Sequence, residues 1–74
     1  MTPEQIRTIR HTVKLTGRHP LHTTTQTEFA RLLNTSAQTV QSWEQGRRHP
    51  SGTALKLLHL LHQSPKLAEQ LQTI

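Results

Sequence analysis

One short stretch of the sequence is rich in small, hydroxyl and amide side chains that carry no charge. These residues are Ser36, Ala37, Gln38, Thr39, Gln41 and Ser42. Val40 and Trp43, three residues apart, mark the buried side of the helix that would carry them. Uncharged donors and acceptors on the outer face of a helix suit the major groove of DNA, where base edges present matching groups. A merely solvated face would usually carry Lys or Glu, so the composition favours contact with base edges.

Two short helices joined by a tight turn must position these residues. Each helix has a start signal, because a Ser or Thr followed three residues later by Glu or Gln forms a capping box. Thr25 with Glu28 gives the first box, and Thr35 with Gln38 gives the second. Asn34 lies in the turn between them, and asparagine is one of the few residues that tolerates a left-handed backbone.

The apolar residues of this stretch recur at helical spacing, which predicts helices over about 26–33 and 36–45. Those that should pack inward are Phe29, Ala30, Leu33, Val40 and Trp43. Gly46 follows the second helix, at the C′ position that favours a residue without a side chain. Together these signals predict a helix-turn-helix over 25–46.

The stretch resembles the helix-turn-helix of the Cro/C1-type (XRE-like) family of phage repressors and antitoxins. Two motifs carry the resemblance: Q-x-E-F-A-x-L-L, which begins at Gln26, and T-V-x-x-W-E-x-G-R-R-x-P, which begins at Thr39. The similarity extends over roughly residues 1–63. It implies an all-α fold, the five-helix lambda-repressor-like DNA-binding domain, with the helix-turn-helix at helices 2 and 3. We expect residues 1–74 to form this single domain.

The resemblance implies roles for several polar residues. The base-reading residues would be Ala37, Gln38, Gln41 and Ser42, and the phosphate-binding residues would be Gln26, Ser36, Thr39, Arg47 and Arg48. Gln38 is the main candidate, because a glutamine amide can make a bidentate pair with adenine N6 and N7. Arg10 and Glu44 would form an ion pair between the first helix and the recognition helix. The alternative for each residue is an ordinary solvated side chain.

The chain begins with a helix start signal. Thr2 caps, Pro3 takes the first helical position, and Gln5 completes a capping box. The apolar face of this helix is Ile6, Ile9 and Val13. We expect the helix to end near Thr16, with Gly17 as the stop signal.

The segment from Gly17 to Thr24 is a loop by composition, and it is longer than the usual connection between the first two helices of the family. It carries Arg18, His19 and His22. These side chains either touch a flanking phosphate, as basic arms do, or are simply solvated.

Two further helices are expected after Pro50. Ser51 should cap a helix over about 52–62, whose apolar residues are Ala54, Leu55, Leu57, Leu58, Leu60 and Leu61. Ser64 and Pro65 should open a fifth helix, with Leu67, Leu71 and Ile74 on one edge. Two helices this rich in apolar residues, over 51–72, suggest a dimer interface. The candidate interface residues are Leu58, Leu61, Leu67 and Leu71. Packing within one chain is the alternative.

Composition limits the partners that this chain can have. The 74 residues include nine Lys and Arg against four Glu, a formal net charge of +5, which favours a polyanion. One Phe and one Trp are too few for the stacking platforms of a single-strand binder. The absence of cysteine, of an apolar run long enough for a membrane span and of a signal peptide predicts a cytoplasmic protein without a membrane partner.

No pattern in the sequence indicates catalysis, and we expect neither an enzyme nor a bound cofactor. The histidine pairs His19–His22 and His59–His62 lack the further ligands that zinc requires, so no metal site is expected. A nucleophile elbow and a Gly-rich phosphate loop are also missing.

These features predict a sequence-specific repressor of double-stranded DNA that binds an inverted repeat as a homodimer. With no room for an effector domain, it would act by occupying the operator of its own operon. Two settings fit: a HigA-like antitoxin with a toxin partner, or a small phage or mobile-element repressor, including those that accompany anti-CRISPR genes. The rival hypothesis is a protein-interaction module in which the helix-turn-helix serves only as a scaffold.

Overall fold

Five helices make up the computed structural model, which describes residues 1–13, 15 and 23–74. They are α1 (Pro3–Thr12), α2 (Gln26–Leu32), α3 (Ala37–Glu44), α4 (Gly52–Gln63) and α5 (Leu67–Gln72). No strand occurs within these described ranges, and the all-α, lambda-repressor-like architecture is confirmed. None of the described helices is long and apolar enough to span a membrane.

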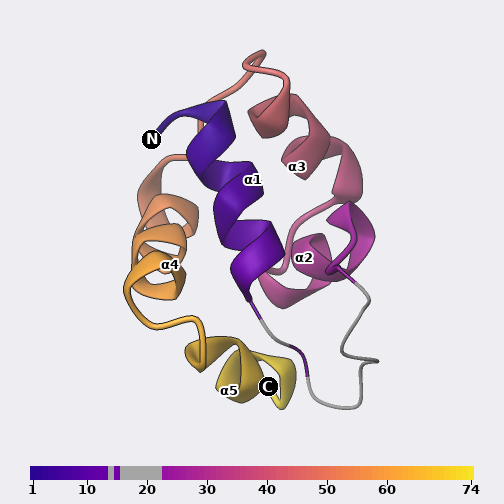
Figure 1. Cartoon of the computed structure of the whole chain (residues 1–74). Helices are drawn as coiled ribbons and strands as arrows, with labels where there is room; N and C mark the ends of the chain where they lie inside the picture. Colours follow the sequence, from indigo (N-terminus) through magenta and orange to yellow (C-terminus); the bar gives the residue numbers. More distant parts are fainter. Residues whose placement is uncertain (14, 16–22) are drawn as a thin grey trace.

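Helix α1 runs through the middle of the molecule (Figure 1). The α2–α3 pair lies on one side of it and α4 on the other, while α5 closes the end where α1 finishes. The predicted apolar faces of the first three helices meet between these elements. The largest fully buried side chains include Ile6, Ile9, Phe29, Val40, Leu58 and Leu61. Each such side chain contributes roughly 1.5–3 kcal/mol relative to an exposed one, so this shared core fixes how α3 is held.

The start of α1 is as predicted, but its end is not. Thr2 and Gln5 form the capping box, with Pro3 in the first turn. The helix stops at Thr12, about four residues before the expected end. Val13 is extended, with ψ at 140°, and its carbonyl accepts a hydrogen bond from the Thr24 hydroxyl at 3.3 Å. This bond to a residue far along the chain takes the place of another helical turn.

The turn between α2 and α3 is a Schellman motif. Asn34 has a positive φ of 59°; its amide donates to the Arg31 carbonyl at 3.2 Å, and the Thr35 amide donates to the Ala30 carbonyl at 2.8 Å. The prediction that Thr35 caps α3 is therefore wrong. Because the Thr35 amide completes the end of α2, the N-cap moves to Ser36, whose hydroxyl accepts from the Thr39 amide.

The end of α3 uses the same device, as the sequence predicts. Gly46 has a φ of 77°, and its amide donates to the Trp43 carbonyl at 3.2 Å. The Arg47 amide donates to the Ser42 carbonyl at 2.9 Å, which completes the motif. The chain therefore leaves α3 abruptly, and it places two arginines directly beyond the helix.

Helix α4 begins where the sequence predicts but lacks the predicted capping hydrogen bond, and α5 begins later than predicted. Ser51 occupies the N-cap position of α4, but its hydroxyl makes no capping hydrogen bond; Gly52, which follows, has a φ of 57°. Ser64 ends α4 and does not cap α5, which begins at Leu67. The Leu67 amide donates to the Ser64 carbonyl at 3.0 Å, so a single tight turn precedes α5.

Candidate nucleic-acid interface

The outer face of α3 has the uncharged surface that its sequence predicts. Gln38 and Gln41 are exposed, and Ala37 and Ser42 beside them are half-buried. Val40 and Trp43, on the opposite side of the helix, are buried against the rest of the domain. The four predicted base-reading residues thus share one face of the helix, with Ala37 at its edge also packed against the core.

Ser36 and Thr39 lie at the start of this helix and contact each other. The Ser36 hydroxyl accepts from the Thr39 amide at 3.1 Å, and the two hydroxyl oxygens are 2.8 Å apart. One hydroxyl hydrogen lies between the two oxygens, and the other is available to an acceptor outside the chain. The capping role of Ser36 was missed in the sequence, although its type and position are typical of an N-cap.

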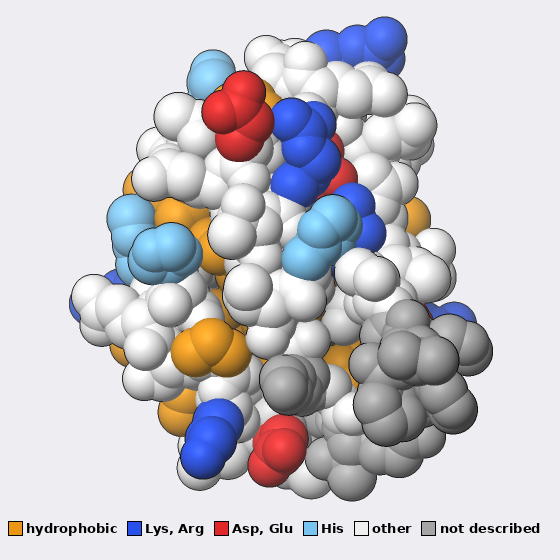
Figure 2. Space-filling view, in the orientation of Figure 1, with side chains coloured by type: hydrophobic (Ala, Val, Ile, Leu, Met, Phe, Trp, Pro, Cys, Tyr) orange, Lys and Arg blue, Asp and Glu red, His pale blue; other side chains and the backbone are white. Residues whose placement is uncertain are grey.

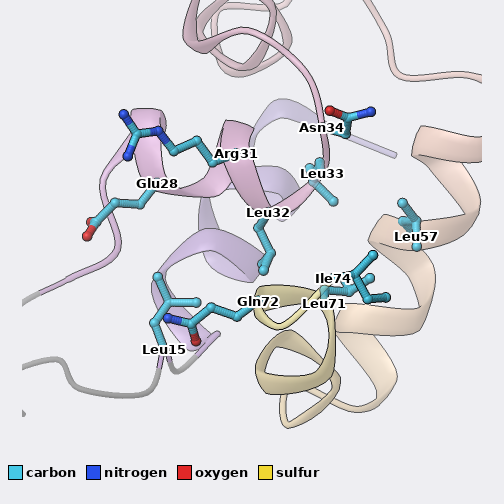
Figure 3. Close-up of a pocket in the computed structure, with 10 residues that line it drawn as sticks. All are labelled: Leu15, Glu28, Arg31, Leu32, Leu33, Asn34, Leu57, Leu71, Gln72 and Ile74. Carbon is cyan, nitrogen blue, oxygen red and sulfur yellow. The ribbon is translucent and has the colours of Figure 1, made fainter.

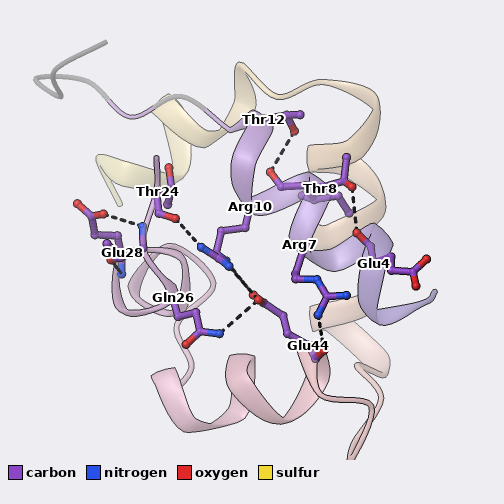
Figure 4. A network of polar contacts seen from close by, with 11 residues as sticks. Glu4, Arg7, Thr8, Arg10, Thr12, Thr24, Gln26, Glu28 and Glu44 are labelled. Atoms are coloured by element: carbon purple, nitrogen blue, oxygen red, sulfur yellow. Dashed lines mark hydrogen bonds and ion pairs between the residues drawn. The ribbon is translucent and has the colours of Figure 1, made fainter. Parts of the chain in front are cut away.

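Arg10 and Glu44 form an ion pair between α1 and the end of α3 (Figure 4). Arg10 Nε donates to Glu44 Oε2 at 2.8 Å, and Nη2 donates to Oε1 at 2.9 Å. The side chains are 13% and 4% exposed. Two parallel charge-assisted bonds give a pair of this kind both strength and a fixed geometry.

Three further hydrogen bonds join this ion pair to its surroundings. Arg10 Nη1 donates to the Thr24 carbonyl at 2.9 Å, and Gln26 Nε2 donates to Glu44 Oε1 at 3.3 Å. Arg7 Nη1 donates to the backbone carbonyl of Glu44, also at 2.9 Å. In the described part of the chain, no buried side-chain nitrogen or oxygen lacks a partner. Sequence reasoning missed these three bonds, because no local spacing announces them.

Gln26 therefore has a role inside the protein as well as its predicted role in phosphate binding. A carboxylate can only accept, so the Gln26 amide must turn its nitrogen toward Glu44. The second hydrogen of that nitrogen remains for an outside acceptor such as a phosphate oxygen. The side chain is half-buried, at the start of α2.

Arg47 and Arg48 are exposed in the turn that follows α3. On the face seen in Figure 2, Lys or Arg side chains lie at the end of the molecule where α3 enters this turn. Arg18, His19 and His22 of the predicted loop lie outside the described residues. Within the described ranges, no three His, Asp or Glu side chains are grouped so that they could hold a metal ion.

The predicted dimer interface needs a correction. Leu58 and Leu61 are fully buried within the chain, so they have no surface to offer to a partner. Their leucine-rich helix turns these two residues toward the core and leaves Leu60 42% exposed. Leu67 and Leu71 of α5 are half-buried.

A groove of about 670 Å³ lies between α2, α4 and α5 (Figure 3). Its apolar lining includes Leu33, Leu57, Leu71 and Ile74, and Arg31 and Asn34 lie on its α2 side. Ile74 is 98% exposed. Apolar surface of the C-terminal segment is therefore accessible along this groove and at Leu60.

Two capped helices, a Schellman turn and an uncharged outer face define a helix-turn-helix protein of the DNA-binding class. Residues 21–61, more than half of the chain, match the family model described as helix-turn-helix. The chain belongs to this family, the Cro/C1-type (XRE-like) DNA-binding transcriptional regulators.

Two relatives are similar over part of the chain. The antitoxin HigA-2 of Vibrio cholerae is 53% identical over 38 residues, which are 51% of this chain and 36% of that protein. The uncharacterized HTH-type transcriptional regulator YiaG of Escherichia coli K12 is 43% identical over 44 residues, 60% of this chain and 46% of that protein. The chain thus spans less than half the length of these relatives.

Proposed function

We propose that this protein is a sequence-specific transcriptional repressor that binds double-stranded DNA and represses its own operon. The observation that carries the proposal is the outer face of α3, where Gln38 and Gln41 are exposed and exposed arginines follow directly. The one charged residue of this helix, Glu44, is buried. Solvation alone does not explain a neutral, amide-rich face, because a solvated helix face usually carries Lys or Glu. The neutral face matches the donors and acceptors of base edges in the major groove.

In this proposal, the residues divide the work of binding. Ala37, Gln38, Gln41 and Ser42 contact base edges. Gln26, Ser36, Thr39, Arg47 and Arg48 contact phosphates, which position α3 without reading sequence. The spare hydroxyl hydrogen of the Ser36–Thr39 pair and the second amide hydrogen of Gln26 support the assignments of those residues.

The DNA-bound form is proposed to be a twofold homodimer on an inverted repeat, acting in the cytoplasm. Leu67 and Leu71, both half-buried, remain the proposed interface residues, and the exposed Leu60 and Ile74 offer further apolar surface. Two α3 helices would enter successive major grooves, with half-sites about 34 Å apart or a multiple of that distance. Occupation of the operator would then exclude polymerase.

A second candidate function is that of an antitoxin, which binds and neutralises a toxin protein. The similarity to the antitoxin HigA-2 supports it. The two functions are compatible, because an antitoxin with a helix-turn-helix can also repress its own operon. The alternative of a pure interaction module would leave the uncharged face of α3 without a purpose.

The test is a titration of the protein against the DNA immediately upstream of its gene, with random DNA of equal length as the control. A preference of about 10³ or more at physiological salt, with a twofold-symmetric footprint, is expected for a repressor. Equal, weak and salt-sensitive binding to both DNAs would overturn the proposal. Stable co-purification with the product of an adjacent gene, in the absence of DNA preference, would favour the antitoxin or interaction module instead.

A further inference from the structure

Arg7 is an exposed cation that the structure holds in one place. Its Nη1 donates to the backbone carbonyl of Glu44, the last residue of α3, at 2.9 Å. In the part of the chain that the structure describes, this is the one hydrogen bond that Arg7 makes, and no carboxylate pairs with it. The positive charge of Arg7 is therefore not neutralised within that part.

The hydrogen bond to the Glu44 carbonyl fixes the position of the Arg7 guanidinium and leaves its other donors available. The last carbonyls of a helix lack partners within the helix, and a cation near them is favourable. An arginine has five N–H donors, of which the Glu44 carbonyl takes one. The remaining donors keep the fork that recognises a phosphate with two parallel bonds.

Arg10, one turn along α1, differs in just this respect. Its Nε and Nη2 donate to the Glu44 carboxylate and its Nη1 donates to Thr24, so its charge and its donors are largely committed. Figure 4 shows Gln26, Arg10 and Arg7 converging on Glu44 from different sides. Of these three side chains, Arg7 alone brings an unpaired charge.

The location of Arg7 is the flank of α3 that faces α1, at the end where Arg47 and Arg48 follow. A helix is about 10–12 Å across and the major groove about 12 Å wide, so the flanks of an inserted helix lie beside the sugar-phosphate backbone. We propose that Arg7 binds a backbone phosphate of the DNA that α3 reads. The inference rests on the proposed DNA binding, and it adds a contact from α1 that the sequence did not indicate.

The test compares the salt dependence of DNA binding among variants. Arg7→Gln removes the charge and retains a donor for the Glu44 carbonyl, whereas Arg7→Lys retains the charge. Lys56→Gln is the matched control, because Lys56 is exposed on α4, on the other side of α1 from α3 (Figure 1). Dissociation constants are measured between about 50 and 200 mM salt, on whichever duplex the parent protein binds best, the upstream fragment or random DNA.

Loss of one phosphate contact should reduce the slope of log K against log salt by about 0.9. Over this range, the parent should therefore lose roughly threefold more affinity than Arg7→Gln. Arg7→Lys and Lys56→Gln should keep the slope of the parent. A role in capping α3 alone would change thermal stability and leave the slope untouched, so unfolding is recorded for each variant. Arg7→Ala, which favours the helix, replaces Arg7→Gln if the latter does not fold.

Three outcomes would overturn the inference. An unchanged slope in Arg7→Gln would show that Arg7 only caps the helix. An equal loss in Lys56→Gln would show an effect of net charge rather than of position. If the parent itself shows no salt-dependent binding to either duplex, the proposed function fails together with the inference; a parent that prefers the upstream fragment while Arg7→Gln keeps its slope refutes the inference alone.

Discussion

The Arg10 guanidinium meets the Glu44 carboxylate side-on, with Nε and Nη2 donating to separate oxygens at 2.8 and 2.9 Å. The pair joins α1 to the last residue of the recognition helix, and Arg10 also reaches the Thr24 carbonyl just before α2. The Arg10 side chain therefore fixes α1, α3 and the start of α2 relative to one another. Lysine could not replace it, because a point charge cannot make these bonds in one plane.

Removing one member of this pair should destabilise the domain strongly. Arg10→Met leaves a carboxylate that is 4% exposed without its cation, and we expect the free energy of unfolding to fall by about 3–5 kcal/mol. The double variant Arg10→Met with Glu44→Leu should lose less than Arg10→Met alone, because no charge stays buried. Urea denaturation followed by circular dichroism measures both values. A loss below about 0.5 kcal/mol in Arg10→Met, typical of a surface residue, would contradict this account.

Substitution of Gln38 should change what the protein reads rather than how tightly it holds phosphates. Gln38→Ala removes an exposed amide from the face of α3, and it should cost about 1–3 kcal/mol of discrimination at one or two base pairs. Titration of the operator and of its single-base variants measures this loss. The salt slope should stay that of the parent. Gln70→Ala, on the exposed side of α5, is the control.

Substitution of Arg47 should do the reverse. Arg47→Ala removes an exposed cation beyond α3, so it should weaken binding to operator and random DNA alike and reduce the salt slope by about 1. The same titrations give the result. If Arg47→Ala and Gln38→Ala behave identically, the roles assigned to the two residues are wrong.

The turn between α2 and α3 should respond to the backbone preference of residue 34. Asn34 has a φ of 59°, and a left-handed conformation costs an ordinary residue about 1–2 kcal/mol. Asn34→Ala should therefore lower the free energy of unfolding by about 1 kcal/mol, whereas Asn34→Gly should be close to neutral. Thermal unfolding of the two variants decides the matter. Equal stability would mean that the turn relaxes to another geometry.

Substitutions of leucines in the two C-terminal helices should distinguish effects on folding from effects on association. Leu58 is fully buried, and Leu58→Ala should cost about 2–5 kcal/mol of stability at any protein concentration. Leu71→Ser, at a half-buried position beside Ile74, should instead weaken the proposed dimer. Sedimentation equilibrium measures the association. An unchanged dimer in Leu71→Ser would move the interface away from α5.

Local signals in the sequence predicted much of this fold. The capping boxes at Thr2 and Thr25 are present, and Gly46 ends α3, because each depends on residues within one turn. The predicted end of α1 is wrong, because the true end depends on the hydrogen bond from the Thr24 hydroxyl to the Val13 carbonyl, which no local pattern indicates. The predicted cap of α3 is wrong because the Thr35 amide would have to serve both the Schellman motif that ends α2 and the capping box that would begin α3.

The candidate site was predictable to a similar degree. Exposed and buried residues of α3 recur with the period of a helix, so their spacing in the sequence predicted which residues form the outer face. A helix as rich in leucine as α4 looks alike from both sides, and its sequence did not show that Leu58 and Leu61 face the core. The contact between Arg7 and Glu44 joins residues far apart in the chain, and no local pattern marks it.

The hydrogen bond between the Thr24 hydroxyl and the Val13 carbonyl also closes the base of the connection between α1 and α2. Arg10 strengthens that closure, because it holds the Thr24 carbonyl from the side of α1. The entropy of closing a chain segment grows only with the logarithm of its length, so a doubling costs about 0.6 kcal/mol. A longer connection would leave both of these hydrogen bonds in place, so we expect a peptide inserted beyond Leu15, which packs against the core, to leave the recognition helix where it is.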